Sequence, residues 1–305
     1  MIFALSTHWN ARKHRQGETM IEEILDMGFK HVELGYDLRH DLVPGVQHMV
    51  KENAVTVNSV HNFCPIPLGA PKGHPELFTF ASTQPHIRES AVRHTVQTIQ
   101  FAAEIGASTV ISHSGNVEME RLTKELIGLI EQNDQFSSTY ERTKLKLQVT
   151  REKKIKKQLS YLYESLEKLL PVLEENKICL ALENLPTWEA IPTEKEIMDL
   201  IQDFNSPHLQ YWHDIGHGQI RENLGLINQE RWLERLHPYL AGMHLHDVAK
   251  RVRDHVMPPL GGIDFSLYKR FVTSNILKVI EPSPGTPSTP IIKGIQHLKQ
   301  VWRPV

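Results

Sequence analysis

Cysteine is scarce in this chain of 305 residues, which contains only two. Cys64 and Cys179 stand in unrelated sequence contexts, which argues against a disulfide framework and favours a reducing compartment. Long apolar runs are also missing. The apolar stretch at the N-terminus is too short for a signal peptide, and no run approaches the roughly 20 apolar residues that a membrane span needs. We therefore expect a cytoplasmic protein with no membrane partner.

The chain also lacks a large excess of positive or negative charge. The formal net charge is −2, so bulk electrostatics do not favour a polyanionic partner, and we do not expect nucleic acid to bind. Residues 142–157 are a local exception, with eight basic side chains against one acidic. No aromatic residues interleave with these charges, which favours a solvated helix face over a nucleic-acid surface.

A glycine-rich dinucleotide loop is absent after the first apolar run, which argues against an open doubly wound sheet. What the chain does contain is a regular alternation of short β-rich runs and longer helical patterns. Predicted strands span about 2–7, 30–35, 55–60, 108–113, 177–183, 209–214, 240–246 and 276–281. Predicted helices lie near 18–27, 42–52, 87–105, 118–132, 136–175, 193–203, 228–236, 265–273 and 289–302.

This alternation predicts one α/β domain over residues 1–305, a (β/α)8 TIM barrel. Gly28, Gly106 and Asn176 stand just before strands, where helix C-cap residues occur. Residues 118–175 are longer than a minimal barrel needs and indicate a helical insertion after strand 4. The proline- and glycine-rich segment 61–86 is also long for a loop, and we expect it to fold over a pocket.

Potential metal ligands recur at the carboxyl ends of the predicted strands. In chain order they are His61, His113, Glu183, Asp214, His217, His244, His255 and Glu281. Carboxylates and imidazoles suit zinc, manganese and similar ions, and parallel barrel strands bring their carboxyl ends together. The pattern therefore predicts a divalent-metal pocket at the top of the barrel. In the segment YWHDIGH, Asp214 and His217 are three residues apart across a glycine turn, whereas His213 alternates to the opposite face as a packed histidine.

The chain resembles the xylose-isomerase-like TIM-barrel superfamily, which includes sugar isomerases, sugar epimerases, inosose dehydratases and endonuclease-IV-type enzymes. The matching segments are VHNFCPIPLG, VISHSG, ALENLP, HDIGHG, MHLHD, DHVMPPLGGIDF and VIEPSPGTP, in the family's order. The resemblance implies a shared metal site of Glu183, Asp214, His244 and Glu281. In MHLHD, His244 and His246 point to the same strand face, and only the family pattern His-Leu-x-Asp selects His244.

The endonuclease-IV-type members hold further zinc ions, so the resemblance allows one to three ions per chain, zinc or manganese. Histidines matching His61 and His113 join the first glutamate around one of these zincs. A histidine matching His217 joins an Asp-x-His pair around a third, for which His255 is the matching histidine. Arg253 stands at the aspartate of that pair and Asp254 is displaced by one position, which puts the third ion in doubt.

The resemblance favours an isomerase or epimerase acting on a sugar, keto-sugar or sugar phosphate through an enediolate. Glu183 and Glu281 would then ligate the metal and also exchange the carbon-bound proton as general base and acid. The expected substrate-binding residues are His217, His246, Glu33 and His8. For Glu33 and His8, at the ends of strands 2 and 1, a structural role is as well supported.

Two other function classes remain open. The extra histidines favour a multi-zinc phosphoester hydrolase of the endonuclease-IV type, on a small phosphorylated substrate rather than on DNA, because no basic and apolar wedge for base flipping is evident. A non-catalytic binding protein on the same fold is the third class. The sequence leaves the substrate and the oligomeric state open.

Overall fold

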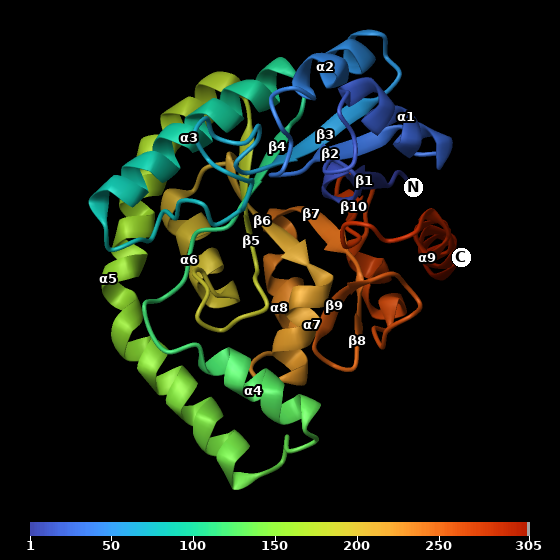
Figure 1. The fold of residues 1–305 in the computed structure, drawn as a ribbon. Coiled ribbons are helices and arrows are strands. Elements are labelled where there is room, and N and C mark those ends of the chain that lie inside the picture. Colours follow the sequence, from blue (N-terminus) through green and yellow to red (C-terminus); the bar gives the residue numbers. More distant parts are fainter. Residues whose placement is uncertain (304–305) are drawn as a thin grey trace.

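In a computed structural model that describes residues 1–303, eight parallel strands close into a barrel (Figure 1). The barrel strands are β1 Ala4–Ser6, β2 His31–Leu34, β3 Thr56–His61, β4 Thr109–Ser112, β5 Cys179–Glu183, β6 Leu209–Asp214, β7 Leu240–Leu245 and β10 Leu277–Ile280. Their order round the barrel is β1-β10-β7-β6-β5-β4-β3-β2. All eight coincide with predicted strands, so the prediction of a (β/α)8 barrel is confirmed.

The strands form because each is a short apolar run buried on both faces. Inside the barrel a separate cluster contains Ala4, Ile111, Ala181, Trp212, Ala241 and Val279. The three alanines of this cluster leave room for the large Trp212 ring. Gly242 on the neighbouring strand is required for the same reason, because a Cβ there would lie 2.2 Å from an atom of that ring.

Helices cover the outside of the barrel. They are α1 Gly17–Asp26, α2 Val43–Lys51, α3 Pro85–Glu104, α6 Glu194–Phe204, α8 Gln229–Leu236 and α9 Ser288–Val301. Gly28 and Gly106 have positive φ angles of 88° and 80°, as expected after a helix. Asn176 does not have the expected role, because it ends its helix and Lys177 takes the left-handed conformation with φ of 55°. Within residues 1–303, no helix combines the length and apolar character needed to cross a membrane.

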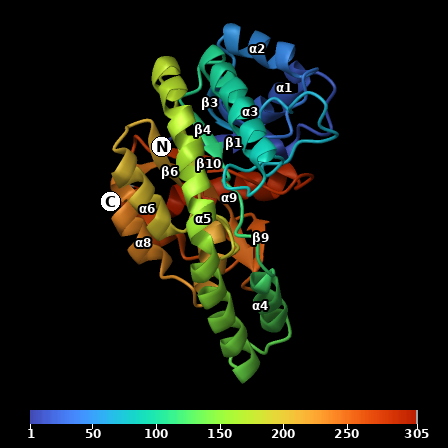
Figure 2. The same cartoon turned by 90° about the vertical axis from the view of Figure 1, so that its left-hand side faces the viewer.

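The predicted insertion after strand 4 is a helical arm, α4 Leu122–Glu131 and α5 Ser138–Asn176. One half of α5 packs against α3, and the other half extends from the barrel beside α4 (Figures 1 and 2). Most basic side chains of 142–157, including Lys153 and Lys157, are exposed, as a solvated face requires. Arg151 is the exception: it is buried, and its guanidinium donates to both Glu196 carboxylate oxygens, at 2.7 and 2.8 Å.

The structure differs from the predicted elements in three places. The expected glycine turn after strand 6 is the helix α7 Ile215–Asn223, whose N-terminus is capped by the Asp214 side chain. The segment after β7 forms an unpredicted antiparallel hairpin of β8 Asp247–Ala249 and β9 Arg253–Val256. The helix expected at 265–273 is a 3₁₀-helix, η3 Phe265–Phe271. Short 3₁₀-turns also occur at η1 Thr7–Trp9 and η2 His237–Tyr239.

Candidate metal centre and active site

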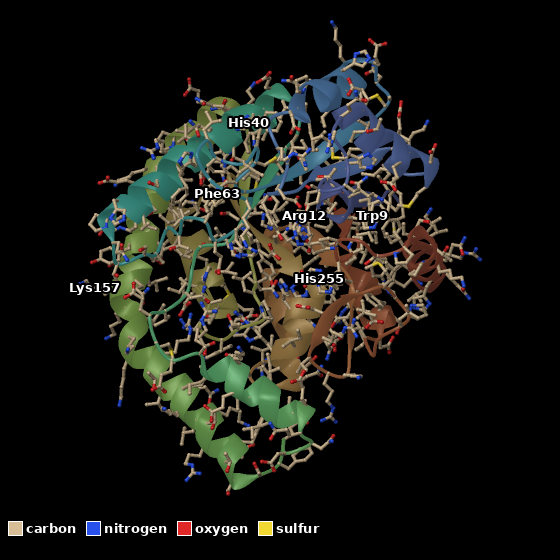
Figure 3. All side chains as sticks on the ribbon, in the orientation of Figure 1. Trp9, Arg12, His40, Phe63, Lys157 and His255 are labelled. Atoms are coloured by element: carbon tan, nitrogen blue, oxygen red, sulfur yellow. The ribbon has the colours of Figure 1, made fainter. Side chains whose placement is uncertain are left out.

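Four candidate ligands meet at the carboxyl end of the barrel. Glu183 and Asp214 end β5 and β6, His244 lies near the end of β7, and Glu281 follows β10. All four side chains are buried. In the side-chain view the centre of the barrel end is dense with nitrogen and oxygen atoms, close to the labelled His255 (Figure 3). Residues almost a hundred positions apart are therefore brought together by parallel strands in a closed barrel.

The ring of His244 lies at the middle of this group. Its Nδ1 is 3.3 Å from a carboxylate oxygen of Glu183, 3.3 Å from one of Glu281 and 3.8 Å from one of Asp214. Three carboxylate oxygens and one imidazole nitrogen form a donor set that suits a divalent cation. Among residues 1–303, the ion pairs of these three carboxylates are all with histidines. The residues present therefore fit a metal site.

The other nitrogen of His244 is held by Glu33. His244 Nε2 lies 3.1 Å from a Glu33 oxygen, and the Ser59 hydroxyl donates to the same carboxylate at 2.9 Å. Because Glu33 holds the Nε2–H of His244, Nδ1 is the nitrogen that would bind a metal. Glu33 is fully buried and, within the described residues, is not part of the cavity wall. Its position behind His244 favours the structural role over the contact with substrate.

His246 is likewise engaged on both sides. Its Nδ1 accepts the backbone N–H of His255 at 2.9 Å, so a neutral ring carries its proton on Nε2, which donates to Asp214 at 2.9 Å. A ring with both nitrogens occupied in this way does not ligate a metal. Gly216 packs so closely that a Cβ there would lie 2.0 Å from the His246 ring. His246 therefore orients Asp214 and is separated from the cavity, where we expected it to contact substrate.

The charges of the cluster depend on one another. Burial alone would raise the pKa of Glu183, but the His244 and His113 rings hold it well below its usual value. Burial also opposes the charged form of His217, yet Asp214 and Glu183 raise its pKa to about 10. These carboxylates are therefore ionised and need positive charge beside them. Protons on the imidazoles supply that charge here, and a divalent cation would supply the same compensation.

A second group forms on the other side of Glu183. His61 Nε2 and His113 Nε2 each lie 3.2 Å from the same Glu183 oxygen, while the other oxygen faces His244. His61 donates from Nδ1 to the Asn62 carbonyl at 3.1 Å, which leaves Nε2 as the metal-facing nitrogen. Glu183 is therefore placed to bridge two sites.

A third group contains His217, Asp254 and His255. His217 donates from Nδ1 to the Asn184 carbonyl at 3.0 Å, and its Nε2 lies 3.8 Å from Asp254. His255 has a left-handed backbone with φ of 51° and donates from Nδ1 to the Glu281 carbonyl at 3.1 Å. The carboxylate of Asp254 thus reaches the site despite its displacement by one position, whereas Arg253 is exposed.

Only part of the predicted set faces the cavity that opens above these residues. The cavity has a volume of about 290 Å³. Glu183, Glu281, His61, His113, His217 and His255 line it, and so does His8, whereas Asp214 and His244 lie beneath. His213, expected as a packed histidine, is buried beside the Tyr211 hydroxyl at 2.6 Å, and burial lowers its pKa to about 4.

Several lining residues were missed by sequence reasoning. They are Tyr36, His74, Glu76, Asn116, Arg121 and Thr187. His74 and Glu76 belong to the segment 61–86, whose unusual length was the signal that it would cover a pocket. The Tyr36 hydroxyl lies 3.1 Å from His8 Nε2, and His8 Nδ1 lies 3.1 Å from Asp37. Burial and the Glu281 charge raise the pKa of Tyr36, so its hydroxyl stays neutral in the cavity wall.

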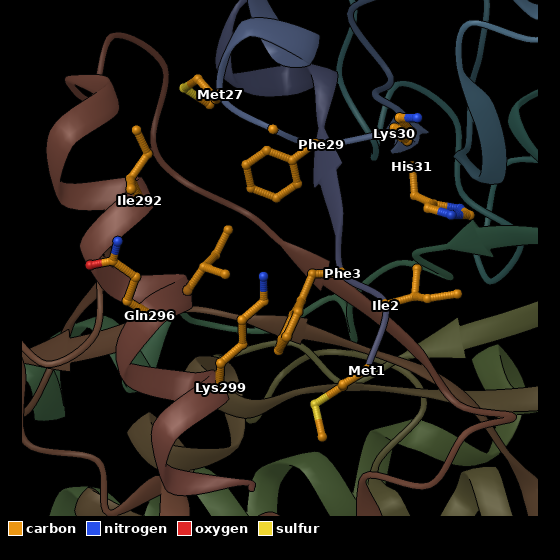
Figure 4. A pocket seen from close by; sticks show the side chains of 12 residues that line it. Met1, Ile2, Phe3, Met27, Phe29, Lys30, His31, Ile292, Gln296 and Lys299 are labelled. Carbon is orange, nitrogen blue, oxygen red and sulfur yellow. The ribbon is translucent and has the colours of Figure 1, made fainter.

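A second hollow, of about 500 Å³, lies at the amino ends of the strands. Figure 4 shows its mainly apolar wall, which includes Phe3, Phe29 and Ile292. The candidate ligands are at the carboxyl ends, so this hollow does not belong to the metal centre.

Comparison with known proteins gives one family and several similar structures. A family model described as xylose isomerase-like TIM barrel matches residues 21–301. A D-tagatose 3-epimerase-like protein has a TM-score of 0.70 and 18% identity, covering 99% of this chain and 97% of its own. A 3-keto-D-glucoside 4-epimerase, YcjR, from E. coli has a TM-score of 0.70 and 16% identity, and the match covers 98% of this chain and 99% of the epimerase. An IOLI protein with a binding zinc atom has a TM-score of 0.65 and 10% identity, and the match covers 99% of this chain and 98% of the IOLI protein. Among curated protein sequences, none matches.

Proposed function

Because the chain belongs to the xylose isomerase-like TIM-barrel family, we propose that it is a divalent-metal-dependent isomerase or epimerase of a sugar, keto-sugar or sugar phosphate. The observation that carries the proposal is the convergence of Glu183, Asp214 and Glu281 on His244 Nδ1. Sugar epimerases among the similar structures support the same class of reaction. A cytoplasmic location stays a prediction.

The four candidate ligands differ in whether their side chains face the cavity. Glu183 and Glu281 line the cavity, whereas Asp214 and His244 lie behind its wall. A bound divalent ion supplies the positive charge that acidifies a proton next to a carbonyl and favours the enediolate. The two glutamates come from β5 and β10, three strands apart round the barrel, so they approach a substrate from different sides.

In this proposal Glu183 and Glu281 move the carbon-bound proton. Burial would raise the pKa of Glu281, but His244 and His255 lower it, so the carboxylate is ionised and able to accept a proton. One glutamate removes the proton from carbon. The other takes up a proton from solvent and then donates it to carbon as the general acid. His217, and Tyr36 backed by His8 and Asp37, offer hydrogen bonds to substrate hydroxyls.

The number of ions decides between this function and the alternative. A multi-zinc phosphoester hydrolase acting on a small phosphorylated substrate is favoured by the group His61–His113–Glu183. The Asp254 carboxylate, 3.8 Å from His217 Nε2, favours it as well. Two or three ions would activate a water and hold a phosphoester, whereas proton transfer between sugar carbons needs only one ion. The IOLI structure with its zinc atom supports zinc, and the carboxylate-rich set suits manganese equally well.

Two measurements on the purified chain test the proposal. Elemental analysis should give about one zinc or manganese per chain, and a panel of keto-sugars should take up deuterium from solvent. Glu281→Gln should lower the exchange rate about 10²- to 10⁴-fold, whereas the exposed Glu175→Gln should leave it unchanged. Two or three ions per chain, with phosphate release and without deuterium uptake, would establish the hydrolase instead. Ligand binding without either reaction would indicate a binding protein.

A further inference from the structure

Arg121 is the only lysine or arginine among the described residues that line the central cavity. Its neighbours in the wall are histidines, carboxylates and neutral side chains such as Asn116 and Thr187. The guanidinium of Arg121 has no ion-pair or hydrogen-bond partner within residues 1–303, unlike those of Arg151 and Arg221, which are paired with glutamates. Unlike those two buried arginines, Arg121 is exposed, so its permanent positive charge stands without a protein partner in the solvent-accessible wall of the site.

The backbone around Arg121 is held on both sides. Before it, the Val117 amide donates to the Glu189 carbonyl at 2.7 Å, and the Glu118 amide donates to the Gln158 side chain at 2.9 Å. After it, the Thr123 amide donates to the Glu189 carboxylate at 2.9 Å. Anchored flanks reduce the entropy lost when a side chain binds a ligand. Arg121 is thus presented to the cavity from a fixed segment.

Nearby carboxylates already have partners of their own. Glu76, in the same wall, accepts the Asn116 amide group at 2.7 Å. Glu189 accepts from Thr123, and Glu183 and Glu281 face the histidines of the metal centre. These groups leave the guanidinium of Arg121 free for an incoming anion. Its planar fork matches phosphate and carboxylate groups, which it binds through paired hydrogen bonds.

We propose that Arg121 binds an anionic group of the substrate, so that the protein acts on an acidic sugar derivative, a phosphomonoester or a carboxylate, in preference to a neutral sugar. The inference rests on the proposed function and narrows its substrate class. With the anion at Arg121 and sugar oxygens at the metal centre, the substrate is held at two points. Two-point binding determines which carbon lies between Glu183 and Glu281.

Binding of small-molecule probes by the metal-loaded protein tests this inference. Isothermal titration calorimetry would compare D-fructose, D-fructose 6-phosphate and D-galacturonate as probes. At least one acidic probe should bind about tenfold or more tightly than fructose, as one charge-assisted contact allows. Arg121→Gln should remove that preference, and Arg121→Lys should keep part of it. Arg142→Gln, the same charge change on the exposed face of α5, should leave it intact.

The outcomes separate this inference from the proposed function. The acidic probe that is preferred identifies the anion as phosphate or carboxylate. Equal binding of all three probes, binding of none, or a preference that survives in Arg121→Gln would overturn the role of Arg121, even if sugars exchange deuterium. A preference that Arg121→Gln removes, in a protein without isomerase activity, would support Arg121 while the proposed function fails. Thermal unfolding of each variant checks that it is folded.

Discussion

At the scale of single residues, hydrogen bonds to the ring nitrogens distinguish candidate ligands from the residues that orient them. His244 and His246 stand two positions apart on β7 and just beyond it, and the sequence pattern alone does not separate them. His246 receives the His255 amide and donates to Asp214, whereas His244 has one nitrogen on Glu33 and the other toward three carboxylates. The contacts with His255, Asp214 and Glu33 therefore decide which histidine is available to a metal.

Glu33→Gln tests this assignment. The amide would no longer stabilise the His244 Nε2–H as a carboxylate does, so His244 would be a weaker and less well oriented ligand. We expect zinc or manganese affinity to fall about 10- to 100-fold, with the fold retained. Competition with a chelator measures the affinity, and Glu174→Gln on the exposed face of α5 is the control. An unchanged affinity would mean that Glu33 does not support the metal site.

At the scale of elements, two buried arginines hold the loop that follows β5. Arg151 of α5 donates to the Ala190 carbonyl and to Glu196, and Arg221 of α7 donates to the Thr187 carbonyl and to Glu194. Thr187 lines the cavity. The helical arm therefore contributes to the shape of the site through this loop, although α5 itself lies outside the barrel.

Arg151→Met should destabilise the protein by about 3 kcal/mol at neutral pH, because it leaves the largely buried Glu196 carboxylate without its partner. Burial would raise the pKa of Glu196, but Arg151 lowers it below the usual value. A carboxylate whose pKa is lower in the folded than in the unfolded chain stabilises the fold above the unfolded pKa of about 4.3. This contribution is lost as the pH falls through the folded pKa. The difference between wild type and variant, measured by urea unfolding, should therefore shrink below about pH 4. A difference independent of pH would contradict this account.

At the scale of the whole molecule, the metal centre joins β5, β6, β7 and the segment after β10. Three buried carboxylates in one cluster repel one another, so we expect the folded chain to bind a cation that the unfolded chain does not hold in this geometry. We expect removal of metal by a chelator to lower the thermal unfolding temperature, and added zinc or manganese to restore it. Binding at a hundred times the dissociation constant contributes about 2.7 kcal/mol. A melting temperature that does not respond to these ions would argue against the site.

The architecture could be predicted from the chain alone, because strand ends, helix patterns and the spacing of Glu183, Asp214, His244 and Glu281 are local signals repeated along it. Those signals are apolar runs followed by polar ligands. In a parallel barrel the carboxyl ends of all strands lie at the same end, so the ligands meet there. The alternation did not reveal α7 or the hairpin β8–β9, because Gly216, Gly218 and the left-handed Lys250 and Arg251 carry no clear propensity for either element.

Contacts between distant segments of the folded chain set the positions of the supporting and lining residues around the candidate ligands. They placed Glu33 and His246 behind the ligands, brought Asp254 to His217 through the left-handed turn at His255, and set Arg121 in the cavity wall. These relations depend on which side chain meets which across strands, helices and the arm. Such contacts are set by packing between distant segments, and no local pattern in the chain encodes them.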